Sequence, residues 1–420
     1  MLKPSKNNFR TYSFAILIVL FFINPIKSQE KNITFNIKKN PVGTNYWWLE
    51  KNNFGREISE FSLEGYFKFK KPKTSYVINL FSEFEKNNLE KISFNELFIK
   101  HALSDNTFFR VGRYYRDFTT YLNNELSSGS MLISHNAQAM PKLGLVTSYI
   151  IKKNEHISFD FGIAHAVFNK NNIYKESPFL HEKFLYMNIK KNNYITSIGL
   201  VHEAIWGGYI ESDHKFAGNQ PSSFSDFLKI FISADGPADI PHENALGNHL
   251  GIWDFLFQKN NNNKILKVYY QHLFEDTSGL RFANKTDGLW GLELTEYLPN
   301  TTILFEYLNT SNQFIDPPYV SEQYYNHFLY RSGWSYKDYT LGNPFIDHLN
   351  IKNIKILHIG VKGKMFENYN YGLKVSKDTN SDENIKYKLS LSKISKNQIQ
   401  FFIVNNGSIN RLGISLSQSL

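Results

Sequence analysis

Four acidic residues lie within one stretch of the chain, at Asp254, Glu275, Asp276 and Asp287. Paired carboxylates cleave glycosidic bonds by acid–base chemistry, and clustered carboxylates bind calcium. Their spacing matches no EF-hand loop, and the residues that follow Glu275 and Asp276 are typical of a turn. We therefore interpret all four as solvated turn carboxylates, some of which lie where a ligand could contact them.

Histidines near these carboxylates are the candidate metal ligands: His202, His242, His249 and His272. His202-Glu203 begins like the H-E-x-x-H motif, but Trp206 occupies the position of the second histidine. Histidines at strand ends or in loops are the plainer interpretation. The sequence contains no cysteine, which excludes zinc–thiolate sites, catalytic thiols and disulfides. It also lacks a phosphate-binding loop and a G-x-S-x-G motif, so we expect no metal, cofactor or nucleic-acid partner and no enzymatic activity.

Two further groups of side chains could recognise a sugar. Arg113 and Arg116 lie in F-F-R-V-G-R-Y-Y-R-D-F, from which they could line a lumen and attract an anionic glycan. The alternative is an ion pair with Asp117 or snorkelling at a membrane interface. Trp206 and Trp334 lie beside long polar segments, where their rings could stack on sugars; an interfacial aromatic belt is the alternative.

The elements that carry these residues alternate with a period of two. In the stretch from Trp253 to Glu293, Leu266, Val268 and Tyr270 alternate with polar or amphipathic residues at positions 267, 269 and 271. This pattern predicts a strand with two different faces. We expect the apolar set to face lipid, and we expect Lys267, Tyr269 and Gln271 to face a lumen.

The N-terminus has the features of a secretory signal peptide over residues 1–28. Lys3, Lys6 and Arg10 precede an apolar run that ends before Pro25. That run is too short to span a hydrocarbon core of roughly 30 Å. Residues 29–58 are polar and irregular, and we predict that they form a periplasmic N-terminal segment. No later apolar run reaches the length of a spanning helix, although the chain has 36 Phe, 25 Tyr and 6 Trp.

Strand-like runs recur from Phe61 to Leu420 and favour a membrane barrel over a soluble sandwich. Short turns such as 190–193 and 260–263 contrast with the long polar segments 211–249 and 308–350, as in outer-membrane barrels. The chain also ends inside a strand, and a barrel must pair its last strand with its first. We predict one all-β domain over residues 29–420, a closed antiparallel transmembrane barrel of about 16–18 strands with long loops on one face.

The formal net charge of +9 is spread along the chain, mainly as lysine. Solvated lumen and loop residues explain it most simply. Attraction to anionic lipid head groups or to an acidic polysaccharide is the more specific explanation.

An ordered set of short motifs resembles the capsule assembly protein Wzi family. The residues that carry the resemblance are Leu126–Ser130, Asn136–Lys142, His202–Gly208, Gly247–Gly251 with Trp253-Asp254, Tyr270–His272, Glu275-Asp276 with Ser278-Gly279, Asp287–Gly291, Gly333–Tyr336 and Leu341–Pro344. The resemblance implies an outer-membrane barrel of eighteen strands that holds capsular polysaccharide at the cell surface without catalysis. It also implies a periplasmic helical bundle, for which the sequence shows no clear helical pattern.

These observations lead us to expect a protein of capsule or exopolysaccharide assembly in the outer membrane, with exported polysaccharide and outer-membrane lipid as its partners. A porin for sugars or small solutes is the alternative, and a secreted all-β glycan hydrolase is a third, weaker one. The oligomeric state stays open. The residues that we expect to contact polysaccharide are Arg113, Arg116, His202, Glu203, Trp206, Asp254, Glu275, Asp276, Asp287 and Trp334.

Overall fold

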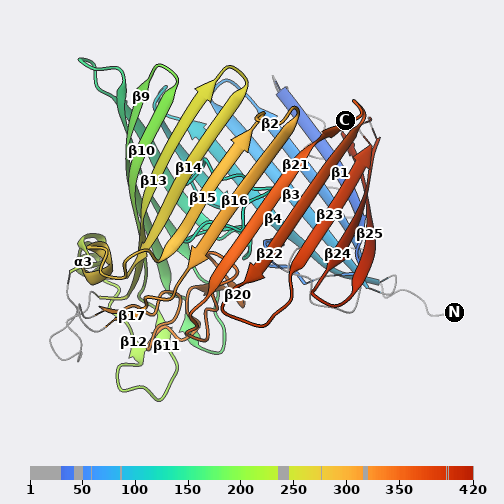
Figure 1. Ribbon diagram of the computed structural model, residues 1–420. Coiled ribbons are helices and arrows are strands. Elements are labelled where there is room, and N and C mark those ends of the chain that lie inside the picture. Colours follow the sequence, from blue (N-terminus) through green and yellow to red (C-terminus); the bar gives the residue numbers. More distant parts are fainter. Residues whose placement is uncertain are drawn as a thin grey trace.

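A computed structural model describes residues 30–41, 51–57, 59–85, 88–234, 246–275, 277–315, 320–393, 395 and 397–419. Eighteen of its strands form one closed antiparallel sheet, a barrel (Figure 1). The barrel strands are β1 (Glu30–Lys39), β2 (Phe61–Lys70), β3 (Thr74–Glu85), β4 (Asn88–Ala102), β5 (Thr107–Arg113), β6 (Pro141–Ile150), β7 (Ile157–Val167), β9 (Phe179–Lys191), β10 (Tyr194–Trp206), β13 (Asn248–Asn261), β14 (Lys264–Phe274), β15 (Gly288–Thr295), β16 (Thr301–Asn309), β21 (Lys355–Met365), β22 (Tyr369–Asp378), β23 (Lys386–Lys393), β24 (Asn397–Asn405) and β25 (Asn410–Ser419). The predicted fold class is confirmed.

The barrel closes where β25 pairs with β1, from Thr34 opposite Ser419 to Lys39 opposite Ile414. The expected pairing of the last strand with the first is therefore confirmed, but the first strand begins earlier than predicted. Residues 29–58 were expected to lie outside the barrel, and that expectation is wrong for β1. The alternation of Ile33, Phe35 and Ile37 with polar residues is short and lies in a polar segment, so it is a weak signal.

The strands have the two faces that the sequence predicts. In β14 the Val268 side chain is 40% exposed on the outer face, whereas Tyr269 is only 2% exposed and Gln271 is fully buried in the lumen. Apolar side chains stay exposed on the outside of many other strands, as on Leu97, Leu185 and Leu389. An apolar outer band with a polar interior is what a membrane barrel requires.

The two ends of the barrel differ in the length of their connections. At one end the strands are joined by short turns, such as 71–73, 192–193 and 262–263. At the other end lie the connections 114–140, 207–247 and 310–354, so the predicted long loops are confirmed. In outer-membrane barrels the short turns are periplasmic and the long loops extracellular. We call these ends the turn end and the loop end.

Few other elements are present in the described chain, and they lie at the loop end. They are the sheet β8 (Tyr174–Glu176), β11 (Tyr209–Ile210) and β12 (Gly218–Asn219), the pairs β17 (Phe314–Ile315) with β18 (Val320–Ser321) and β19 (Ser335–Tyr336) with β20 (Tyr339–Thr340), and the helices α3 (Phe224–Ile232) and α4 (Thr277–Leu280). Within the described ranges, neither helix is long and apolar enough to cross a membrane, and no helical bundle lies at the turn end. The predicted signal peptide, 1–28, lies outside the described residues.

Candidate functional site

The connection 114–140, which we call the lumen loop, folds back into the barrel. Its contacts reach strands that are far apart around the wall. The Thr119 amide donates to the Tyr186 hydroxyl of β9 at 3.2 Å, and the Leu126 carbonyl lies 2.6 Å from Nε2 of His358 on β21. The loop also supplies many fully buried apolar residues, among them Phe118, Met131 and Leu132. It therefore fills part of the barrel interior with a packed core.

A second segment, residues 322–349, covers the lumen loop, and we call it the cap loop. The Trp334 indole donates to the Leu132 carbonyl at 2.9 Å, and Ser134 Oγ donates to the Gly342 carbonyl at 2.6 Å. Asn343 Nδ2 donates to the Gly129 carbonyl at 2.8 Å. These bonds join side chains to backbone carbonyls that would otherwise be buried without partners, so the two loops form one unit.

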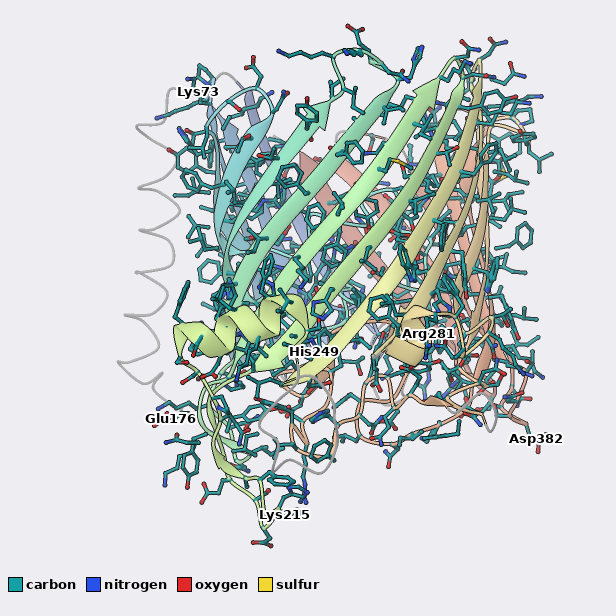
Figure 2. All side chains as sticks on the ribbon, turned by 90° about the vertical axis from the view of Figure 1, so that its left-hand side faces the viewer. Lys73, Glu176, Lys215, His249, Arg281 and Asp382 are labelled. Atoms are coloured by element: carbon teal, nitrogen blue, oxygen red, sulfur yellow. The ribbon has the colours of Figure 1, made fainter. Side chains whose placement is uncertain are left out.

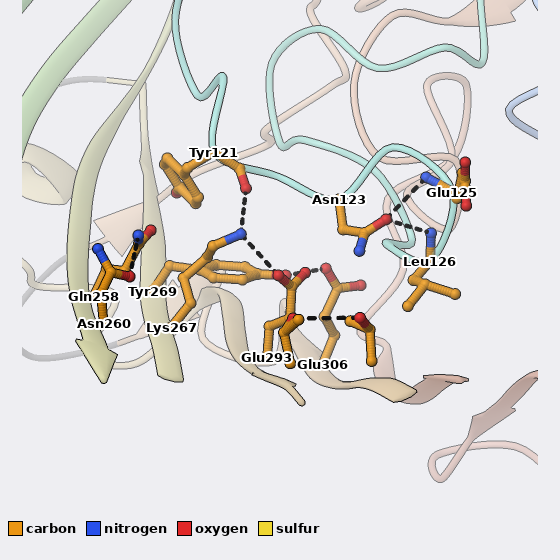
Figure 3. A network of polar contacts seen from close by, with 12 residues as sticks. Tyr121, Asn123, Glu125, Leu126, Gln258, Asn260, Lys267, Tyr269, Glu293 and Glu306 are labelled. Atoms are coloured by element: carbon orange, nitrogen blue, oxygen red, sulfur yellow. Dashed lines mark hydrogen bonds and ion pairs between the residues drawn. The ribbon is translucent and has the colours of Figure 1, made fainter. Parts of the chain in front are cut away.

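Inward-facing carboxylates of the wall hold the lumen loop in place. Glu306 of β16 accepts hydrogen bonds from Ser127 Oγ at 2.6 Å and from the Ser128 amide at 2.7 Å. Figure 3 shows the further hydrogen bond that it accepts from the Tyr269 hydroxyl. Lys267 of β14 donates to the Tyr121 carbonyl at 2.8 Å and pairs with Glu293 at 2.9 Å, as Figure 3 also shows. Each of these three wall charges therefore has a partner in the lumen loop or on the neighbouring strand.

Asp254 of β13 completes this row of wall carboxylates. It accepts a hydrogen bond from the Tyr121 hydroxyl and another from the Tyr186 hydroxyl at 2.6 Å. Asp254 is 1% exposed. Hydrogen bonds to a buried carboxylate are the condition under which it can stay in a protein interior.

Asp287 performs a similar task just before β15. It accepts hydrogen bonds from the Tyr324 hydroxyl at 2.7 Å, from Asn309 Nδ2 at 2.9 Å and from the Asn312 amide at 2.9 Å. Burial raises the pKa of its carboxyl group, although the bonds from Tyr324 and Asn312 lower it. Asp287 therefore ties the start of the cap loop to the barrel wall.

Helix α3 lies outside the barrel, across the wall at the loop end (Figure 2). Ser223 and Asp226 form a capping box at its N-terminus. Phe227 packs on the rings of His165, His181 and Trp206, which come from three adjacent strands. Other apolar side chains of the helix remain exposed, with exposed fractions of 75% for Phe224 and 71% for Ile232.

The sheet of β8, β11 and β12 projects beyond the strand ends, where Figure 2 places Glu176 and Lys215. It is held at its base by a hydrogen bond between the hydroxyls of Tyr174 and Ser332, and by Tyr330, which donates to the Gly207 carbonyl at 3.3 Å.

Basic and aromatic side chains lie together on and beside this sheet. Lys175 lies 5.3 Å from the Tyr209 ring centre, and Lys215 lies 4.7 Å from that of Phe216. The ring of His214 lies 5.4 Å from that of Phe328 on the cap loop. We call the following exposed or half-buried set the loop-end patch: Lys175, Tyr209, His214, Lys215, Phe216, Phe328 and Arg331.

Comparison with known proteins now identifies the family. The profile described as "Capsule assembly protein Wzi" matches residues 125–399, which is more than half of the chain. This chain belongs to the Wzi family. The match covers the lumen loop from Glu125, the cap loop and most of the barrel.

Among solved structures, the chain is similar to Wzi of Escherichia coli, described as an outer-membrane protein involved in group 1 capsule assembly and as a carbohydrate-binding β-barrel. The TM-score is 0.60 at 14% identity, over 100% of this chain and 89% of that one. A mutant porin of Rh. blastica gives a TM-score of 0.40 at 6% identity, over 93% and 99% of the two chains. No curated protein matches the chain. The predicted family and the predicted outer-membrane location are confirmed.

In this Wzi-family barrel, two of the acidic residues are not the solvated turn carboxylates that we predicted. Asp254 lies within β13 and Asp287 is fully buried, and both hold loops. The interpretation failed because sequence does not show which segment enters the lumen. Glu275 accepts a hydrogen bond from the Gln323 amide at 2.8 Å, whereas Asp276 lies outside the described residues.

The predicted residues on β10 are divided between its two faces. His202 points outward beneath α3, where its Nε2 lies 2.8 Å from Nδ1 of His249. Glu203 points inward and is fully buried, and neither carboxylate oxygen has a hydrogen-bond partner among the described residues. Trp206 packs against Phe179 at 5.2 Å between ring centres. The structure therefore does not bring these residues together with Asp254 or Asp287 in one cleft.

The predicted arginines, Arg113 and Arg116, and Trp334 lie within or against the lumen and cap loops. Arg113 donates to the Ala139 carbonyl at 3.1 Å, and Arg116 donates to Thr119 Oγ1 at 2.8 Å. Burial lowers the pKa of Arg116. Asp117 pairs instead with Arg110, at 2.9 Å, so the predicted alternative named the wrong arginines. Trp334 is fully buried, in contact neither with lipid nor with solvent.

Histidine placement agrees with the plainer interpretation. His202, His249 and His272 lie near strand ends, and His242 is outside the described residues. No group of three or more metal-ligating side chains gathers within the described ranges. The loop-end patch was not predicted, because its residues come from separate polar loops and share no periodic pattern.

Proposed function

We propose that this barrel binds or anchors exported polysaccharide, of the capsular or exopolysaccharide class, at the cell surface and performs no catalysis. The observation that carries the proposal is the packed unit of lumen loop and cap loop, which presents the loop-end patch outward from a rigid base. A barrel whose interior is occupied by its own chain is suited to bind a ligand at its loop end rather than to conduct solutes.

The loop-end patch has the chemistry of a glycan-binding surface. Tyr209, Phe216 and Phe328 offer ring faces for sugar rings, while Lys215 and Arg331 offer cations for acidic substituents. Lys175 and Lys215 already lie over aromatic rings, so the charge is held beside the stacking surface. Binding by several weak contacts of this kind suits a long polymer with repeated epitopes.

For the ten residues predicted from sequence, we propose mainly an indirect role in sugar binding. Asp254, Asp287 and Trp334 are buried within the wall and loops, and Arg116 is half-buried beside them. All four would act by fixing the shape of the loop end. Glu275 lies nearer the surface and is the predicted residue best placed for direct contact.

We propose outer-membrane lipid as the second partner, through α3. The exposed apolar face of this short amphipathic helix suits the boundary between head groups and acyl chains. A groove of about 360 Å³ on the outer wall runs between Phe161, Leu185, Leu200 and Phe231, with Lys183 at its edge. An acyl chain fits the apolar walls, and Lys183 would meet a phosphate of the head group.

The test removes two side chains of the loop-end patch and leaves the barrel strands unchanged. Lys215→Ala with Phe216→Ala should reduce the retention of exported polysaccharide on cells by about tenfold, the loss of one charge contact and one stacking contact. Lys152→Ala, an exposed lysine in a short turn, is the matched control. Unchanged retention in the double variant and in a full deletion would refute the proposal.

A further inference from the structure

The lumen loop leaves one part of the barrel interior unfilled. Among the described residues, no hydrogen bond or ion pair joins the lumen loop to β22–β25 or to β1. A cavity of about 690 Å³ lies there, between the lumen loop and the strands β21–β24. Glu125 and Leu126 of the lumen loop form its roof, and Glu296 and Asn300 belong to a turn of the turn end. We call it the lumen pocket.

The lumen pocket contains more positive than negative charge. Its lining includes four lysines and two glutamates, Lys362, Lys364, Lys374, Lys388, Glu125 and Glu296. One pair is neutralised, because Lys362 lies 2.6 Å from Glu125. Within the described chain, no carboxylate lies within the 4.0 Å of an ion pair from Lys374 or Lys388.

Lys374 and Lys388 are also direct cross-strand neighbours. They are opposite each other in the register of β22 and β23, and both point into the lumen. Like charges directly opposite on a sheet destabilise it. Lys38 of β1 lies 5.4 Å from the Phe402 ring centre, and Lys388 lies 4.8 Å from the same ring, which adds a third cation nearby. Among the described residues no carboxylate forms an ion pair with Lys374 or Lys388, so an acidic ligand could supply a closer opposite charge.

The rest of the lining is suited to hydroxyl groups. Asn370, Ser390, Gln398 and Gln400 supply amide and hydroxyl groups, and the Tyr371 hydroxyl is fixed 2.8 Å from Thr301 Oγ1. A cavity of this volume lies within the range of small-ligand sites. Unlike a plain anion site, it combines cations with many polar groups that match a polyhydroxylated molecule.

We propose that the lumen pocket is a second binding site, on the turn-end side of the lumen loop, for a short acidic oligosaccharide. The carboxylates or phosphates of the sugar lie between Lys374 and Lys388, and its hydroxyls meet the amides of β22 and β24. The site is separate from the loop-end patch, because the lumen loop stands between them. It goes beyond the proposed surface anchoring.

The test measures binding of trigalacturonate to the full-length protein in detergent by isothermal titration calorimetry. Maltotriose serves as the neutral sugar and inorganic phosphate as the plain anion. Trigalacturonate should bind about tenfold or more tightly than either, and more weakly as salt rises. Lys374→Gln with Lys388→Gln should weaken its binding about tenfold or more. Lys377→Gln, an exposed lysine of the same strand, should bind as wild type does.

A further variant distinguishes loss of trigalacturonate binding from loss of folding. Lys388→Glu gives Lys374 an opposite charge across the strands, so the barrel should be at least as stable while trigalacturonate binding is lost. Equal binding by the wild type and the double variant would overturn the proposal, and so would equal binding of phosphate or maltotriose. The trigalacturonate result does not depend on whether the Lys215→Ala, Phe216→Ala variant loses surface polysaccharide.

Discussion

Charged side chains in two regions of the lumen differ in whether the lumen loop supplies their hydrogen-bond partners. Over β13–β16, Asp254, Lys267 and Glu306 are each bonded to the lumen loop. Over β22 and β23, Lys374 and Lys388 are opposite each other with no loop between them. Burial of a charge is tolerated when the chain supplies its partner, whereas an uncompensated pair remains available to a ligand. The first region therefore builds the platform, and the second retains the capacity to bind.

The largest expected effect comes from removing a wall carboxylate in the first region, β13–β16, which the lumen loop fills. Glu306→Ala leaves Ser127, Ser128 and Tyr269 without their acceptor and should lower the free energy of unfolding by about 3 kcal/mol. Denaturant unfolding in detergent measures it. Glu383→Ala, which breaks an exposed pair with Lys386, should cost less than about 1 kcal/mol. Equal losses in the two variants would mean that the wall carboxylates do not hold the loop.

Acidification should loosen the lumen loop and the cap loop. Burial, with a smaller contribution from nearby positive charge, lowers the pKa of His135 in the lumen loop and of His327 in the cap loop to about 3. Both pKa values lie below that of the unfolded chain, so the stabilisation is complete above about pH 6.5 and falls as the pH drops toward 3. The slope is at most about 1.4 kcal/mol per pH unit for each histidine.

Limited proteolysis at several pH values measures this loosening. Cleavage within residues 114–140 should increase between pH 6 and pH 4, and the increase should be smaller in a His135→Gln, His327→Gln double variant. Proteolysis that does not change with pH would contradict the role assigned to the buried histidines.

In the second region, β22 and β23, we expect a substitution to raise the free energy of unfolding, by the smallest amount of the effects predicted. Lys388→Gln removes a cross-strand repulsion, so it should raise the free energy of unfolding by about 0.5 kcal/mol. Lys377→Gln should change it by less. A clear loss of stability in Lys388→Gln would show that the lysine is already compensated in the folded protein.

The barrel itself could be predicted from sequence because its signal is local. Val268 and Tyr269 point to opposite faces in any strand, and short turns such as 262–263 set the boundaries. β1 was missed because its alternation is short. The loops could not be predicted, because a bond such as that from Ser127 to Glu306 joins residues 179 positions apart. For the same reason, Asp254 and Trp334 were placed at the surface rather than in the core.

Planar-bilayer recording of the wild-type protein measures whether the chain itself closes the lumen. A platform closed by the lumen and cap loops should give little current and no steady open steps. Steady open steps from the unaltered protein would contradict this account and support a porin instead.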